Sequence, residues 1–94
     1  MREGHVTPVH PGKVLQDELD ELGATQASLA DRIGVLPKTI NEICRGKRGI
    51  SAEMATKLSK ALGASPQFWL NLQSNWELSQ IDKRSFEDIK RLAA

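Results

Sequence analysis

Residues 25–46, TQASLADRIGVLPKTINEICRG, set the architecture that we predict for this chain. Ala30 has almost no side chain, so a second helix can cross close to its backbone, and Gly34 tolerates the left-handed conformation that ends a helix. Two short helices, residues 26–33 and 37–45, are therefore expected on either side of a tight turn that carries Pro37. Apolar or small residues recur in them at helical spacing, at Ala27, Ala30, Ile33, Ile40 and Ile43.

The order of residue types across this turn is typical of a DNA-binding helix-turn-helix. It has a small residue at Ala30, a glycine at Gly34 and a β-branched residue at Ile40. In such a motif the second helix enters the major groove of DNA. We therefore predict that residues 37–45 form a DNA-reading helix.

The exposed side of that helix carries residues that can reach base edges. Because Ile40 and Ile43 are expected to face inward, the opposite side should face solvent or DNA. An ordinary solvated helix surface is the alternative interpretation. The base-reading residues that we predict are Lys38 for guanine, Asn41 for adenine, and Pro37 and Thr39 for a thymine methyl group.

Phosphate contacts are expected around the same surface. Glu42 would repel phosphates there, so we expect it to pair with Lys38 or Arg45 within its own helix rather than to accept from a cytosine. The predicted phosphate-binding residues are Gln26, at the start of the first helix of the motif, and Arg45, Lys47 and Arg48, in and before the glycine-bracketed loop 46–49.

Composition favours a helical bundle. The 94 residues suit one domain with a small core, and the low aromatic content of 4% without any Tyr favours packing by Leu, Ile, Val and Ala. The 13 Lys and Arg against 12 Asp and Glu give a net charge of +1, so affinity for DNA must come from local clustering. We expect an all-α domain over residues 1–94.

Other functional classes find little support. A single cysteine, Cys44, excludes an intrachain disulfide framework, and we interpret it as a semi-buried structural thiol rather than a redox switch. His5 and His10 lack a paired acid or nucleophile, so an enzyme, a metal site, a cofactor and a small-molecule substrate are not expected. No apolar run approaches the ~20 residues of a membrane span, and MREGHVTPVH lacks the apolar stretch of a signal peptide. We therefore expect a cytoplasmic protein.

Helices are also expected on both sides of the motif. After an arm over residues 1–9, a helix starts near Pro11 and ends at Leu22, with Leu15, Leu19 and Leu22 on one face. Further helices cover residues 52–62 and 66 to about 81, and these elements form a core over residues 10–80. In the extension 81–94, Ser85 and Asp88 resemble a capping box, which predicts a short sixth helix over residues 86–92.

Two helices present surfaces that suggest protein partners. The first has an acidic outer face, which is either a solvated surface or a dock for a basic protein. The last has a second apolar stripe that one core cannot bury, so we predict a homodimer, with cover by the sixth helix as the alternative. The acidic face comprises Asp17, Glu18, Asp20 and Glu21, and the predicted dimer stripe comprises Leu70, Ser74, Leu78 and Ile81.

The chain resembles the HigA-type (VapI-like) antitoxins of the Xre/Cro helix-turn-helix superfamily. The resemblance runs from His10, Pro11 and Gly12 through GVLPKTINEICRGKRGIS to LGASPQFWLNLQ, and so covers residues 10 to about 80. HPG and SPQFWLNLQ are particular to this group. The resemblance implies a five-helix Cro/repressor-like bundle that dimerises through its fifth helix and binds a palindromic operator at its own promoter.

The same resemblance implies a toxin partner and roles for particular residues. HigA-type proteins neutralise HigB, a small basic RelE-like ribonuclease that cleaves mRNA at the ribosome. The family's phosphate-clamping glutamine falls on Gln26, and its base-reading helix start falls on Pro37, Lys38 and Thr39. Leu36 departs from the usual Ser or Thr. A toxin surface on the acidic face would lie outside the predicted DNA surface. A free-standing Xre-family regulator without a toxin is the alternative.

Overall fold

The computed structural model describes residues 8–93, which form five α-helices and one short 3₁₀ helix without any strand. The predicted all-α architecture is confirmed. Helix boundaries agree with the predictions to within about two residues, and the predicted arm lies outside the described residues except for Pro8 and Val9. The elements are α1 (Pro11–Leu22), α2 (Gln26–Ile33), α3 (Pro37–Cys44), α4 (Ala52–Leu62), α5 (Pro66–Ser79) and η1 (Lys83–Phe86).

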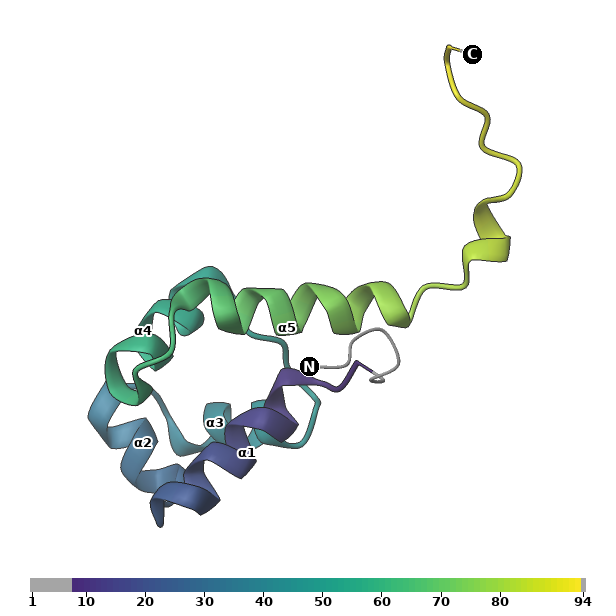
Figure 1. Ribbon diagram of the computed structural model, residues 1–94. Helices are drawn as coiled ribbons and strands as arrows, with labels where there is room; N and C mark the ends of the chain where they lie inside the picture. The colour runs from purple at the N-terminus through teal and green to yellow at the C-terminus, as the bar shows by residue number, and fades with distance from the viewer. Residues whose placement is uncertain (1–7, 94) are drawn as a thin grey trace.

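Helices α2 and α3 form the predicted helix-turn-helix (Figure 1). Thr25 caps α2 because its Oγ1 accepts a hydrogen bond of 3.0 Å from the Ser28 N–H, and Ser28 Oγ accepts one of 3.1 Å from the Thr25 N–H. Gly34 ends the helix with a φ of 74°, which a side chain would strain. Leu36 gives α3 no side-chain cap, as predicted from its residue type.

One hydrophobic core joins all five α-helices. Ala30 and Ile40 are fully buried, so α2 and α3 pack closely as predicted. Two residues of the predicted apolar pattern do not enter the core. Ala27 is exposed because α2 turns Leu29 inward instead, and Leu22 is 59% exposed because it lies in the last turn of α1, beside the turn into α2. The core comprises Leu15, Leu19, Leu29, Ala30, Ile40, Ile43, Ile50, Ala55, Leu58 and Trp69.

The start of α1 is fixed by contacts with two distant helices. His10 Nδ1 accepts a hydrogen bond of 2.9 Å from the Gly12 N–H, and burial lowers the pKa of His10, which favours the neutral ring that can accept. The imidazole also meets the Trp76 ring edge-on, with 4.7 Å between centroids. Gly12 lies so close to α3 that a Cβ atom there would be 1.8 Å from the carbonyl oxygen of Ile43.

Gln73 of α5 fixes the chain between α3 and α4. This buried side chain accepts a hydrogen bond of 2.8 Å from the Ile50 N–H and donates one of 2.8 Å to Glu77 Oε2. Gly49 leaves room for it, since a Cβ atom there would be 2.8 Å from Gln73 Nε2. The sequence analysis did not single out Gln73.

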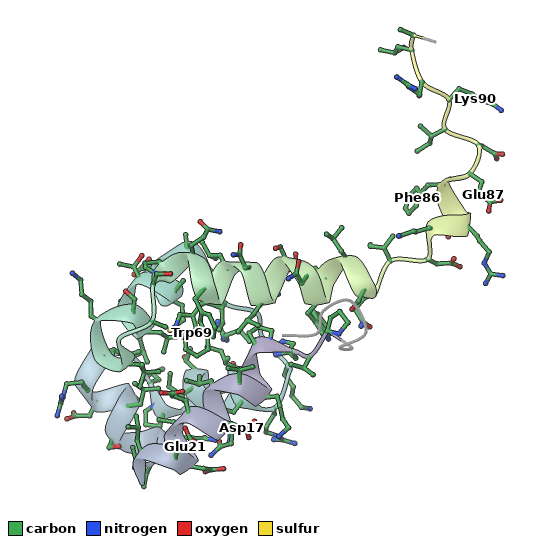
Figure 2. The ribbon with its side chains drawn as sticks, viewed as in Figure 1. Asp17, Glu21, Trp69, Phe86, Glu87 and Lys90 are labelled. Atoms are coloured by element: carbon green, nitrogen blue, oxygen red, sulfur yellow. The ribbon has the colours of Figure 1, made fainter. Side chains whose placement is uncertain are left out.

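The predicted sixth helix over residues 86–92 is wrong. Only η1 forms, capped by Asp82, whose Oδ1 accepts from the Arg84 N–H at 3.1 Å, and residues 87–93 are not helical. Seven residues are too few to hold a helix in water without a packing surface, and this segment extends away from α5 instead of folding over it (Figures 1 and 2). The radius of gyration, 16.0 Å, accordingly exceeds the ~12 Å of a compact chain of this length.

We predict that Gly12→Ala lowers the free energy of unfolding by about 3 kcal/mol, the upper end of the cost of overpacking. The new methyl group would meet the backbone of α3, which cannot move aside as a flexible side chain could. Urea unfolding followed by circular dichroism measures the loss. Gly63→Ala is the control: its φ is 92° but no atom lies within 4 Å of the new Cβ, so it should lose only about 1 kcal/mol. Equal losses would contradict the close approach.

Candidate nucleic-acid interface

The predicted reading residues all belong to α3 or its first turn, and Lys38 and Asn41 lie on the side away from the residues that anchor the helix in the core. Ile40 and Ile43 are fully buried. Pro37 and Lys38 are exposed, whereas Thr39 and Asn41 are half-buried. Asn41 is less accessible than Lys38, and its amide donates a hydrogen bond to a side chain of a neighbouring helix.

That neighbour is Gln26, the first residue of α2. Gln26 Oε1 accepts a hydrogen bond of 3.1 Å from Asn41 Nδ2, and Gln26 Nε2 donates one of 2.7 Å to Gln16 Oε1 on α1. The sequence analysis assigned Gln26 to a phosphate and Asn41 to a base as separate contacts, and the structure brings the two amides together. Gln16 was missed because nothing in the local pattern of α1 distinguishes it from a solvated polar residue.

The loop after α3 carries an ion pair that the sequence analysis placed differently. Glu42 Oε1 accepts hydrogen bonds from Arg48 Nε at 2.9 Å and Arg48 Nη2 at 2.8 Å, so the predicted pair with Lys38 or Arg45 is wrong. The chain turns back at Gly46, where φ is 75°, and this brings Arg48 over α3. The hydrogen bond with Arg48 lowers the pKa of Glu42, which therefore stays charged.

The cations of this region are exposed. Arg45, Lys47 and Arg48 all lie at the surface between α3 and α4. Because Arg48 shields Glu42, the only acidic side chain within residues 37–49, the net field of this surface is positive despite the near-neutral chain.

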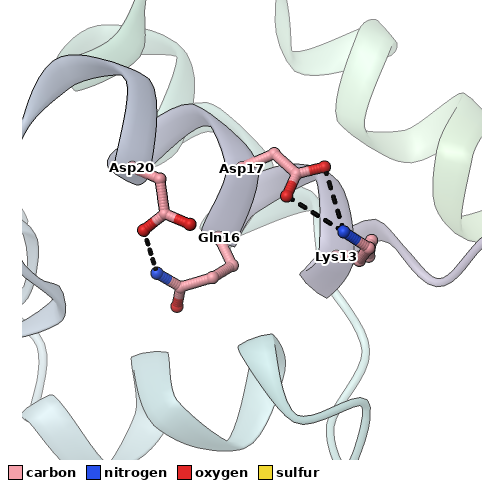
Figure 3. Close-up of polar contacts among 4 residues, drawn as sticks. All are labelled: Lys13, Gln16, Asp17 and Asp20. Carbon is pink, nitrogen blue, oxygen red and sulfur yellow. Dashed lines mark hydrogen bonds and ion pairs between the residues drawn. The ribbon is translucent and has the colours of Figure 1, made fainter.

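The acidic residues of α1 differ in their surroundings. Asp17 pairs with Lys13 at 3.1 Å, and Asp20 accepts a hydrogen bond of 2.8 Å from Gln16 Nε2 (Figure 3). Asp17, Asp20 and Glu21 are exposed, but Glu18 is half-buried and so contributes less to the predicted acidic face. Figure 2 shows Asp17 and Glu21 on α1.

The predicted dimer stripe is open along most of its length. Leu78 is 67% exposed, Ile81 is 49% exposed and Ser74 is also exposed, whereas Leu70 is half-buried against the core. Residues 86–92, predicted as the alternative cover, leave this stripe open, and their apolar residues Phe86, Ile89 and Leu92 are themselves exposed.

Three further features bear on other functional classes in the part of the chain that the structure describes: metal sites, membrane spans and the single cysteine. Over residues 8–93 no three His, Cys, Asp or Glu side chains gather as metal ligands would, and no helix is both long and apolar enough to traverse a bilayer. Burial raises the pKa of the half-buried Cys44 thiol, and the charge of Asp20 adds to the rise. A raised pKa makes the reactive thiolate scarcer.

Comparison with known proteins identifies the group. The HTH_3 helix-turn-helix family model matches residues 15–69. Virulence-associated protein A′ of Dichelobacter nodosus is 42% identical over 86 residues, covering 90% of this chain and 75% of that protein. Antitoxin HigA-1 of Vibrio cholerae is 36% identical over 91 residues, covering 96% and 86%. The solved structure described as Pseudomonas aeruginosa antitoxin HigA with higBA promoter has a TM-score of 0.84 and 41% identity, covering 90% of this chain and 98% of that one. The chain therefore belongs to the HigA-type (VapI-like) antitoxins of the Xre/Cro helix-turn-helix superfamily, which are DNA-binding proteins and not enzymes.

Proposed function

We propose that this protein is the antitoxin of a type II toxin–antitoxin system, which binds operator DNA as a homodimer in the cytoplasm, represses its own operon and neutralises a HigB/RelE-like mRNA-cleaving toxin. The observation that carries the proposal is the exposed side of α3, whose Lys38 and Asn41 lie next to the cationic loop while Ile40 and Ile43 anchor the helix. A relative of 41% identity is described together with promoter DNA, which supports the same use of this surface.

In this proposal the contacts to DNA divide into two kinds. Base edges are read by Pro37, Lys38, Thr39 and Asn41, and phosphates are bound by Gln26, Arg45, Lys47 and Arg48. Arg48 contributes twice, because it adds a positive charge and it neutralises Glu42. The homodimer forms through Leu70, Ser74, Leu78 and Ile81, and we expect half-sites about 34 Å apart, one helical turn, or a multiple of it.

The toxin surface that we propose is the acidic face of α1, at Asp17, Glu18, Asp20 and Glu21. A basic toxin is attracted by clustered carboxylates.

We expect the wild-type protein to bind the DNA upstream of its own gene at least a thousandfold more tightly than scrambled DNA, on the order of the usual ratio for specific binders. Fluorescence anisotropy titrations at two salt concentrations measure both affinities. Salt must be varied because phosphate contacts alone give tight binding at low ionic strength. Equal affinity for the two DNAs would refute operator reading.

Lys38→Ala and Arg48→Ala should impair DNA binding in different ways. Loss of Lys38 removes a base contact and should reduce discrimination between operator and scrambled DNA by ~1–3 kcal/mol. Loss of Arg48 removes a phosphate contact and exposes the charge of Glu42, so it should weaken binding to both DNAs and reduce the salt slope by about 1. The same titrations test both variants. Equal losses on operator and scrambled DNA for Lys38→Ala would overturn its assignment.

The double reversal Asp17→Lys with Glu21→Lys should weaken toxin binding by at least tenfold, roughly the effect of losing two interfacial charges, and leave operator affinity nearly unchanged. The toxin to use is the product of a small basic nuclease reading frame beside this gene, with calorimetry as the measurement. Asp31→Lys, at an exposed position of α2, is the control and should bind toxin as the wild type does. Unchanged toxin affinity in the double variant would reject this surface, and absence of any such toxin would favour the free-standing regulator.

A further inference from the structure

A chain of hydrogen bonds connects the acidic face of α1 to the DNA-reading side of α3. Asn41 donates to Gln26 at 3.1 Å, Gln26 donates to Gln16 at 2.7 Å, and Gln16 donates to Asp20 at 2.8 Å. Figure 3 shows its last link, between Gln16 and Asp20. The three amides come from three helices, and every donor in the chain points towards the carboxylate.

The carboxylate dictates that direction. An ionised Asp accepts hydrogen bonds and cannot donate, so Gln16 must turn its NH₂ group towards Asp20 and its carbonyl oxygen towards Gln26. Gln26 must then offer its own NH₂ to Gln16 and its oxygen to Asn41. Without a charged acceptor at one end, each amide could rotate by half a turn, and the chain could run either way with the same number of hydrogen bonds.

We propose that Asp20 and Gln16 are positioning residues for DNA recognition, which hold the amides of Gln26 and Asn41 in the orientation that reads the operator. This inference rests on the proposed operator binding, and it adds two residues of α1 that need not touch DNA. They act through Gln26: the hydrogen bond from Gln26 to Gln16 fixes the Gln26 amide, and the Gln26 carbonyl oxygen then accepts from Asn41.

The orientation leaves suitable groups free on both amides. Gln26 uses one N–H on Gln16 and keeps the other for a phosphate oxygen. Asn41 uses one N–H on Gln26 and keeps its second N–H and its oxygen, the pair that matches N7 and the N6 amino group of adenine. A reversed chain would turn the Gln26 carbonyl away from Asn41 and would change which group Asn41 has free for the base.

The direct test compares Asp20→Asn with Asp17→Asn. Both remove one exposed negative charge from α1, but only Asp20 accepts from Gln16, whereas Asp17 pairs with Lys13. Asp20→Asn should reduce the ratio of operator to scrambled-DNA affinity by about fivefold to tenfold, part of the value of one bidentate base contact. Asp17→Asn should keep the wild-type ratio. Thermal unfolding of both variants checks that neither effect reflects lost stability.

A second variant restores the direction by another route. In the double variant Asp20→Asn with Gln16→Glu, the net charge is that of the wild type and the carboxylate at position 16 can only accept from Gln26 Nε2. Its discrimination ratio should return to within about twofold of the wild type, the usual scatter of additive effects. In an Asn41→Ala background, Asp20→Asn should have no further effect on the ratio.

The outcomes separate this inference from the proposed function. If the wild type itself does not discriminate between operator and scrambled DNA, operator reading fails and the inference fails with it. If the wild type discriminates and Asp20→Asn behaves as Asp17→Asn does, only the inference is overturned. A loss with Asp20→Asn that persists in the Asn41→Ala background, or that Gln16→Glu does not restore, would also overturn it, because the effect would not pass through the amides.

Discussion

Helix α1 approaches the backbone of α3 at Gly12, where there is no room for a side chain. The carbonyl of Ile43 occupies the space where any other residue at position 12 would carry its Cβ atom. This close approach constrains how α3 packs against α1, and with Ile40 and Ile43 in the core it leaves Lys38 on the opposite side of α3 exposed. His10 caps α1 next to this contact and touches Trp76 of α5, so the first and last helices position the reading helix together.

The same contact places the polar residues of α1. Gln16 and Asp20 follow Gly12 at intervals of four residues, so they lie along the same side of α1, one and two turns further on. That side faces the helix-turn-helix, which is why Gln16 reaches Gln26 although ten residues separate them. The side of α1 that faces the motif therefore packs tightly against α3 at Gly12 and makes hydrogen bonds further along, at Gln16. Leu15 and Leu19, on another side of α1, are buried in the core.

Helix ends could be predicted from the sequence because the residues that cap them lie next to the helix in the chain. Contacts between residues far apart in the chain could not. Thr25, Ser51 and Ser65 each cap a helix through a hydrogen bond to a residue three positions on, and such signals are legible in sequence. Gln73 accepts a hydrogen bond from the Ile50 N–H, 23 residues away in the sequence, and no periodic pattern in the sequence predicts that contact.

Two errors have the same origin. Glu42 was assigned to the nearest cations along its helix, but the turn at Gly46 brings Arg48 closer in space. Ser85 and Asp88 were assigned to a capping box from their spacing alone, but Asp82 provides the cap and a helix also needs a surface to pack on. Within the described residues the segment after η1 has none. Phe86, Ile89 and Leu92 are therefore exposed, as Leu78 and Ile81 of the predicted dimer stripe are.

Asp20 takes part in both of the proposed interactions. It belongs to the acidic face proposed for the toxin, and it is the acceptor at the end of the chain of amides that we propose to read DNA. A toxin cation that took Oδ1 of Asp20, the oxygen that accepts from Gln16, would displace the Gln16 amide and so loosen Gln26 and Asn41. Linkage then requires the converse: DNA that holds the amides in place favours the Asp20–Gln16 bond and disfavours that cation by the same free energy. Under both proposals, separate surfaces on α1 and α3 would therefore not make the two partners independent, because three hydrogen bonds connect Asp20 to Asn41.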